Sequence, residues 1–312
     1  MSWGFDVPRL LKRLHGRFSV YQAHSSGYGF DLPPGVPVVA VSRNTLGYWG
    51  DRAPRNPLFF LPNALEPKWM ERGARQNVSD IRPIDVLVQQ RKSSDYVLRQ
   101  LVPALRSRGI RVEVQSGWVD DLVDLFNSAK VYVYDSAEHW RAAGVSEGFG
   151  LPPLEAMACG CVVFSSLNHA LADTLTPGEL GHQIGCGSLA YDVDRIVAAV
   201  AAPADWRGSA SVLDTFLEAY SEPVLKQRWQ QLLGEEGLDD SRHGMLRGLV
   251  ATVAKVRARD VISDAVRVAL TRDAARARRD RRRGRRERRR PPLDGAAPAR
   301  RQPRAARVRA HA

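Results

Sequence analysis

Short apolar runs alternate with longer amphipathic segments through the middle of the chain. The apolar runs occupy residues 85–90, 110–115, 130–136 and 161–166. Between and after them, residues 93–109, 119–129 and 192–203 place apolar side chains at helical spacing. Buried strands that alternate with helices of this length are typical of βαβ units in a parallel sheet. We therefore predict an α/β fold with its functional loops at the carboxyl ends of the strands.

The two flanking regions show different patterns. Strand-like pieces at 17–25, 36–42 and 58–63 are joined by loops rich in glycine and proline, with few helical segments between them. About 60 residues can hardly bury a core of their own, so this region is predicted to form the end of a sheet that packs on another part of the protein. Residues 210–237 predict one or two amphipathic helices.

The composition is that of a globular protein, with 44% hydrophobic and 26% charged residues in a chain of 312. No apolar run approaches the roughly 20 residues of a membrane-spanning helix, and the N-terminus lacks the apolar region of a signal peptide. Three cysteines, Cys159, Cys161 and Cys186, are an odd number without CxxC spacing. This usage favours a reducing, cytoplasmic compartment and indicates neither a disulfide framework nor a metal site.

The net charge of +12 belongs to one end of the chain. Residues 271–312 contain 17 arginines and 4 acidic residues, which leaves 29 basic and 30 acidic residues in 1–270. The segment is predicted to be a disordered tail, because arginine, alanine and proline dominate it. A solvated tail without a partner, an artefactual reading frame, and an electrostatic contact with nucleic acid or anionic lipid are the open interpretations. No aromatic residue lies between 284 and 312, so base stacking is unsupported.

The stretch SEGFGLPPLEAMACGC, residues 146–161, carries the clearest chemistry. Gly148 and Gly150 allow positive φ and a close approach of backbone N–H groups to a ligand. The two prolines that follow suit the first turn of a helix, and Gly160 suits its C-terminal cap. The free N–H groups and partial positive charge at this helix start predict an anion site, with a diphosphate as the expected occupant.

Glutamates flank the same turn on both sides. Glu147 precedes the turn, and Glu155 lies in the first turn of the predicted helix. Carboxylates accept hydrogen bonds from sugar hydroxyls, so amides for phosphate and acids for hydroxyls together fit a nucleotide-sugar. Two glutamates eight residues apart also occur by chance, and Glu155 could simply favour the helix dipole. The prediction of a nucleotide-sugar site therefore rests on the whole string and not on the two glutamates alone.

The string EGFGLPPLEAMACG resembles, nearly letter for letter, the donor-site signature of retaining glycosyltransferases with the GT-B fold. These are the family-four-like enzymes called glycosyl transferases group 1, whose hallmark is two glutamates separated by seven residues. The resemblance covers roughly residues 18–235 and is best between 85 and 205. It implies four parts: an acceptor-side remnant at 1–66, a Rossmann-like nucleotide-sugar domain at 67–205, helices at 206–270 and the tail at 271–312.

The resemblance also assigns roles to residues of the turn. Glu147 would lie against the hydroxyls of the donor sugar, as a catalytic residue, and Glu155 would hold the ribose. The backbone amides of the turn, in Gly148, Phe149, Gly150 and Leu151, would contact the sugar and the phosphates.

Basic residues outside the motif complete the implied site. Arg91 and Lys92 follow the first strand of the Rossmann-like domain, where the family neutralises the diphosphate. Arg91 matches the family's arginine, whereas the family's lysine usually comes several residues later than Lys92; a solvated loop is the alternative. His24 follows a strand, as does the family histidine that reaches the donor sugar. A structural histidine is the alternative there.

Two departures from the family pattern stand out. About 100 or more residues normally precede these strands, so the chain has an upstream start, is a shortened form, or receives the missing half from a partner. The segment AEHWRAAGVS, residues 137–146, is longer than usual. Its Trp140 would either pack over the donor or anchor the loop.

The implied reaction transfers a sugar from a nucleoside diphosphate to an acceptor hydroxyl with retention, in cell-envelope polysaccharide or glycoconjugate assembly. No cofactor or metal is expected. We expect a cytoplasmic protein, with peripheral contact to a membrane through the tail as a further hypothesis. One rival is a catalytically impaired module that binds nucleotide-sugar for regulation or assembly. Another is a polyanion-binding protein that works through residues 271–312.

Overall fold

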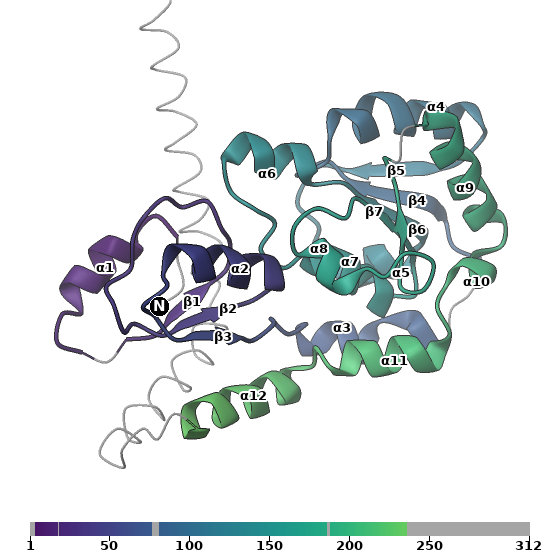
Figure 1. Cartoon of the computed structure of the whole chain (residues 1–312). Coiled ribbons are helices and arrows are strands. Elements are labelled where there is room, and N and C mark those ends of the chain that lie inside the picture. Colours follow the sequence, from purple (N-terminus) through teal and green to yellow (C-terminus); the bar gives the residue numbers. More distant parts are fainter. Residues whose placement is uncertain (1–3, 18, 77–80, 186–187, 236–312) are drawn as a thin grey trace, which may run out of the picture. The chain divides into compact units, whose positions relative to one another are not determined.

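The computed structural model describes residues 4–17, 19–76, 81–185 and 188–235 (Figure 1). All described residues belong to one compact unit, which ends at Gly237. The arginine-rich segment and Cys186 therefore lie outside the described residues, and the predicted domain boundaries stay predictions. Within the described residues, the strands form one three-stranded and one five-stranded sheet.

The larger sheet has the strand order β5-β4-β6-β7-β8, and all neighbours in it are parallel. Its strands are β4 (Ile84–Gln89), β5 (Val112–Gln115), β6 (Ala129–Tyr134), β7 (Val162–Ser165) and β8 (His182–Gln183). The first four coincide with the four predicted apolar runs, so the predicted α/β fold with a parallel sheet is confirmed. The sequence pattern missed β8 because two residues are too few to form a pattern.

Helices cover both faces of this sheet (Figure 1). Leu87, Tyr132 and Val163 share a core with α5 (Leu122–Asn127) and α7 (Leu151–Ala158). The alternate strand residues, among them Val86 and Val131, share a second core with α4 (Val102–Ser107) and α9 (Leu189–Ala201). Because successive side chains of a strand point to opposite faces, a sheet that is covered on both sides reads as a continuous apolar run.

The predicted helix at 93–109 is present but irregular. A wide π-helical turn, Val97–Leu101, leads directly into α4. Pro103, the second residue of α4, has no N–H to donate to the carbonyl four residues earlier. This break in the regular hydrogen bonds lies directly after the wide turn, and a periodicity argument does not reveal it.

The smaller sheet consists of β1 (Tyr21–Ala23), β2 (Val38–Ala40) and β3 (Leu58–Phe60), again all parallel. The three predicted strand pieces are confirmed, although each strand is shorter than its piece. Two helices accompany them, α1 (Val7–Arg13) and α2 (Arg43–Arg52). The hydroxyl of Ser42 caps α2 by accepting from the N–H of Thr45.

Two helices end the described region, as predicted for 210–237. They are α11 (Ala210–Glu218) and α12 (Glu222–Glu235). Apolar side chains of α12, Leu225, Trp229 and Leu232, pack against Val20, Val39 and Leu61 beside the smaller sheet. No helix among the described residues is both long and apolar enough to span a membrane.

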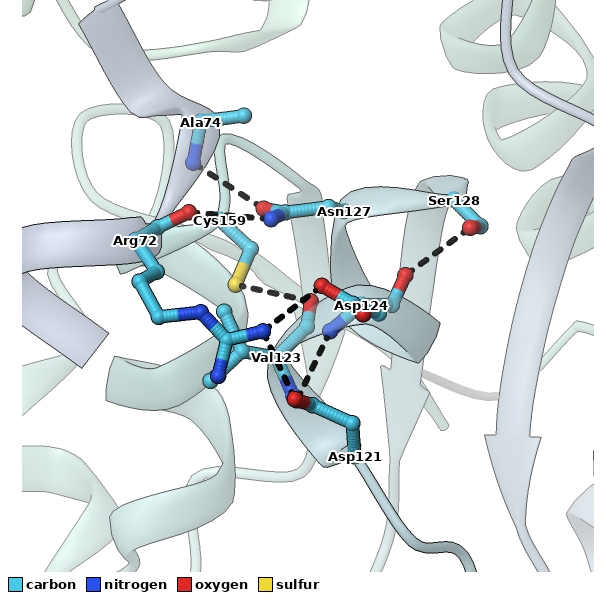
Figure 2. Close-up of polar contacts among 8 residues, drawn as sticks. All are labelled: Arg72, Ala74, Asp121, Val123, Asp124, Asn127, Ser128 and Cys159. Carbon is cyan, nitrogen blue, oxygen red and sulfur yellow. Dashed lines mark hydrogen bonds and ion pairs between the residues drawn. The ribbon is translucent and has the colours of Figure 1, made fainter. Parts of the chain in front are cut away.

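The connection between the sheets is fastened to α5 (Figure 2). It contains α3 (Pro67–Arg72), and the guanidinium of Arg72 pairs with Asp121 at 2.6 Å and Asp124 at 2.9 Å. Asn127 donates to the carbonyl of Arg72 at 3.0 Å and accepts from the N–H of Ala74 at 2.9 Å. These contacts fix the C-terminal end of α3, so the position of its N-terminal end near α7 is fixed as well.

Candidate functional site

The turn of the EGFG motif lies between α6 (Ala137–Ala143) and α7, after the carboxyl end of β6. Gly150 caps α7 with φ 82°, which explains the requirement for glycine there. Gly148 lies so close to the smaller-sheet loop that a methyl group on it would overlap the carbonyl oxygen of His24. The two glycines thus serve a sharp turn and a close backbone contact.

Three serines join the same two loops. The hydroxyl of Ser25 donates to the carbonyl of Ser146 at 2.6 Å. The N–H of Ser26 donates to the hydroxyl of Ser146 at 3.0 Å. Ser25 and Ser146 are both buried, so these bonds are shielded from water. The structure therefore brings His24 to the turn, as the sequence predicted.

Glu147 is 4% exposed, and one oxygen of its carboxylate, Oε2, accepts three hydrogen bonds. The donors are the hydroxyl of Tyr134 at 2.6 Å, the hydroxyl of Ser136 at 3.0 Å and the indole N–H of Trp140 at 2.7 Å. Burial, with the carboxylate beside it, raises the pKa of Tyr134 well above its usual range, so the hydroxyl keeps its proton. No described group donates to Oε1. The described residues hold the carboxylate by Oε2 alone.

The backbone of Glu147 is held by His169, which follows β7. The N–H of Glu147 donates to Nδ1 of His169 at 3.2 Å. His169 has φ 54°, a left-handed conformation that few residues other than glycine adopt. The contact therefore fixes the backbone of the turn beside the Glu147 carboxylate.

The backbone amides at the centre of the turn make no hydrogen bond to any described residue. Within the described part of the chain, no group accepts a hydrogen bond from the N–H of Gly148, Phe149 or Gly150. The side chain of Phe149 is buried, with its ring centroid 5.6 Å from that of Tyr220. The ring anchors the turn in the core, and the free amides add to the partial positive charge of the helix N-terminus. Leu151 is the first residue of α7.

Glu155 lies beyond the first turn of α7, because the helix begins at Leu151; the predicted place in the first turn is wrong. The side chain is half-buried, and no described group donates a hydrogen bond to its carboxylate. Burial, reinforced by the carboxylate of Glu66, raises the pKa of Glu155 to about 7. The nearby ammonium of Lys68 opposes this shift. This acid therefore lacks the hydrogen-bond donors that surround Glu147.

Lys92, rather than Arg91, is turned toward the acids. Lys92 has φ 72°, and its Nζ lies 4.5 Å from the centroid of the Trp140 ring. Burial lowers the pKa of Lys92, and the charges of Glu147 and Glu155 partly offset this effect. No described carboxylate lies within salt-bridge distance of Nζ, whereas Arg91 is exposed to solvent. A half-buried cation without an adjacent carboxylate is suited to an anionic ligand.

His24 contributes an uncharged ring. Burial lowers the pKa of His24 to about 4, so its imidazole is neutral at pH 7. A neutral imidazole has one N–H donor and one acceptor, which suits contact with a sugar hydroxyl. The assigned roles of His24 and of the turn residues stay predictions.

Sequence reasoning missed the groups that orient Glu147. Tyr134, Ser136 and His169 come from the carboxyl ends of β6 and β7, which are neighbours in the sheet. Their position at the ends of predicted strands could have identified them from the sequence, because functional loops were expected there. The sequence left two alternatives for Trp140, packing over the donor and anchoring the loop. In the structure its indole N–H donates a hydrogen bond to Glu147.

The described residues contain no group of three or more His, Cys, Asp or Glu side chains that could hold a metal ion. Cys159 and Cys161 are buried free cysteines, and burial raises the pKa of the Cys161 thiol to about 11. Both thiols therefore stay protonated and unreactive at neutral pH. The expectation that the protein needs no cofactor stays a prediction.

Comparison with known proteins gives a family match for the part of the chain that contains the EGFG turn. Residues 106–202 match the model of the family described as Glycosyl transferases group 1. A stretch of 47 residues is 47% identical to the serotype-specific mannosyltransferase WbdA of Escherichia coli. That stretch is 15% of this chain and only 5% of WbdA.

Solved structures share the fold at low identity. Sucrose-phosphate synthase of Thermosynechococcus elongatus is 17% identical with a TM-score of 0.52, over 75% of this chain and 72% of that chain. HepE of Anabaena, solved with UDP and glucose, is 15% identical with a TM-score of 0.52, over 74% and 75% of the two chains. A glycosyltransferase of Rickettsia africae is 11% identical with a TM-score of 0.53, over 75% and 80%. The segment that contains the EGFG motif therefore matches the glycosyl transferases group 1 family, and the two-sheet architecture is the GT-B fold.

Proposed function

We propose that the protein binds a nucleoside-diphosphate sugar at the EGFG turn and transfers the sugar to an acceptor hydroxyl with retention. One observation carries the proposal: several groups around the turn have no hydrogen-bond partner among the described residues, and these groups match the parts of such a donor. They are the amides of Gly148, Phe149 and Gly150, the ammonium of Lys92, and carboxylate oxygens of Glu147 and Glu155.

The diphosphate would lie over the turn. Negative charge builds on the leaving diphosphate as the bond to the sugar breaks. The N–H groups of the turn and the N-terminus of α7 are oriented before the reaction, and Lys92 adds a full positive charge. Preorganised donors of this kind are commonly worth about 3 kcal/mol each in the transition state. Arg91, exposed beside Lys92, would contribute at longer range.

The sugar would lie between Glu147 and His24. Oε1 of Glu147 accepts from a sugar hydroxyl, while Tyr134, Ser136 and Trp140 keep Oε2 fixed. The neutral ring of His24 reaches the sugar from the opposite loop. Groups that are held in place before the reaction stabilise the transition state more effectively, because no free energy is spent on orienting them during the reaction. Glu155 would hold the ribose, whose hydroxyls supply the donors that its carboxylate lacks.

The relatives suggest the classes of donor and product. HepE was solved with UDP and glucose, and WbdA is a serotype-specific mannosyltransferase. We therefore propose a hexose donor and a glycan product of polysaccharide or glycoconjugate assembly. The cytoplasmic location, inferred from cysteine usage, belongs to the same proposal.

Turnover of a donor panel tests the function. The full chain is incubated with UDP- and GDP-hexoses and a set of glycan and lipid acceptors, and nucleoside diphosphate release is measured. Glu147→Gln should lower the rate about 100-fold or more with the fold intact, and Glu113→Gln, at an exposed site on β5, should leave it unchanged. NMR of the anomeric carbon reports retention or inversion. Nucleotide binding without turnover for any acceptor would instead indicate the binding-only module.

A further inference from the structure

Trp140 contacts two of the proposed ligand-binding groups with different parts of one side chain. Its indole N–H donates to Oε2 of Glu147 at 2.7 Å. Its ring lies 4.5 Å, centroid to Nζ, from the ammonium of Lys92. Glu147 and Lys92 come from the turn and from the loop after β4, which lie far apart in sequence. Trp140 therefore contacts both groups.

The contact with Glu147 decides which carboxylate oxygen is free. An indole N–H can only donate, so this bond always requires an acceptor. Together with Tyr134 and Ser136, it gives Oε2 three donors. Because Oε2 already accepts three hydrogen bonds, a ligand hydroxyl is expected to donate to Oε1 instead. Loss of the indole N–H would leave Oε2 with two donors, so the orientation of the carboxylate would be less firmly fixed.

The contact with Lys92 stabilises a cation that burial disfavours. An ammonium over an indole face is attracted by the ring quadrupole, and indole is the best of the aromatic partners. Lys92 reaches this position with a left-handed backbone, φ 72°, which turns its side chain from the path of the strand. Because burial lowers the pKa of Lys92, the ring face helps to keep the ammonium charged and in place.

The helix that carries Trp140 is fixed to the loop of Lys92. The carboxylate of Glu138 accepts from the N–H of Asp95 at 2.8 Å. At the other end of α6, Gly144 caps the helix with φ 69°, and the N–H of Val145 donates to the carbonyl of Trp140 at 3.2 Å. The segment 137–146, which is longer than in the family pattern, thus connects the EGFG turn to the loop after β4.

We propose that Trp140 is a positioning residue that couples the sugar-binding carboxylate to the phosphate-binding ammonium. The indole N–H sets the orientation of Glu147, and the indole face sets the place of Lys92. This inference rests on the proposed function and adds a residue to its site. It predicts that the two effects of Trp140 can be separated, since only one of them needs the N–H.

Two substitutions separate them. Trp140→Phe keeps an aromatic face for Lys92 but loses the N–H, so kcat should fall about 10-fold while the Kd for UDP stays within about 2-fold. Trp140→Leu loses both contacts, so the Kd for UDP should also rise about 3- to 10-fold. Trp229→Phe, at a half-buried site on α12 beside the smaller sheet, is the matched control and should change neither value.

A third substitution tests whether the effect on UDP passes through Lys92. In a Lys92→Met background, Trp140→Phe and Trp140→Leu should bind UDP equally, because no cation remains for the ring to hold. A difference that persists in this background, or equal UDP affinity of the two variants in the Lys92 protein, would overturn the coupling. Thermal unfolding of each variant shows whether the fold is retained.

A readout without ligand keeps the inference separate from the proposed function. In protein labelled with ¹⁵N-tryptophan, the indole signal that Trp140→Phe removes is that of Trp140. This signal should shift in both Glu147→Gln and Lys92→Met, and should not move in Glu113→Gln. If it responds to neither of the first two changes, the coupling is wrong whatever the protein binds. If it responds to both but no nucleotide binds, the proposed function fails while the contact network stands.

Discussion

The two glutamates of the motif lie in opposite environments. The orientation of Glu147 is fixed without a ligand, because three side chains hold one carboxylate oxygen and His169 holds the backbone. At the Glu155 end, no described group donates a hydrogen bond to the carboxylate, and burial raises its pKa to about 7. The protein therefore provides the orientation at one end, and a ligand would have to provide it at the other.

This difference matches the roles proposed for the two acids. A group that acts on the reacting sugar gains from an orientation fixed in advance, because the cost of ordering it does not fall in the reaction. A group that only holds the ribose can be ordered by the ligand itself. Substitutions at the Glu147 end should therefore affect kcat, and substitutions at the Glu155 end should affect binding.

The largest effect is expected from Gly148→Ala, which disturbs the ordered end directly. The new methyl group would overlap the carbonyl of His24, so the two loops must separate. We expect a destabilisation of about 3 kcal/mol and loss of transfer, measured by thermal unfolding and turnover. Gly47→Ala is the control: it lies in α2 with open space around it and should stabilise by up to about 1 kcal/mol. Equal behaviour of the two variants would contradict the close contact.

A smaller effect is expected at His169, which holds the backbone of the same end. His169→Gly relieves the left-handed backbone but leaves the N–H of Glu147 without an acceptor, so kcat should fall about 10-fold. His169→Asn tolerates that backbone and offers an oxygen near the place of Nδ1, so it should keep activity within about 3-fold of the original. If the glycine variant is the more active of the two, the backbone strain matters and the hydrogen bond does not.

The smallest effect concerns the pH dependence of stability at Glu155. Its folded-state pKa of about 7 lies above the ordinary value of 4.5, so the folded protein keeps a proton that the unfolded chain releases. The stability from this proton is complete below about pH 4.5 and is lost as the pH rises through 7. The Tm of Glu155→Gln relative to the unsubstituted protein should therefore increase from pH 5 to pH 8. A difference that stays constant over this range would mean that Glu155 is not desolvated.

The sequence predicted the larger sheet well because its strands are buried on both faces. Residues 85–90 and 130–136 read as apolar runs for that reason, and the structure places β4 and β6 there. The turn was predicted for a different reason, since glycine, proline and acid at fixed spacing leave few alternatives. The strand pattern and the motif of the turn both consist of residues that are close together in the sequence.

The rest of the site depends on contacts between distant segments. The sequence favoured Arg91 over Lys92, but a left-handed backbone at Lys92 turns its ammonium to Trp140 and leaves Arg91 in solvent. His169 likewise approaches Glu147 only because β6 and β7 are neighbours in the sheet. A left-handed backbone is uncommon for residues other than glycine, so the residue types alone did not predict either position.

The most direct test of the site follows the amide resonances of Gly148, Phe149 and Gly150 while UDP or GDP is added to the full chain. These N–H groups have no acceptor among the described residues, so a bound diphosphate should shift all three together. Glu155→Gln should require a higher nucleotide concentration for the same shift. If either nucleotide binds and these three resonances stay in place while others move, the diphosphate lies elsewhere and the account of this turn is wrong.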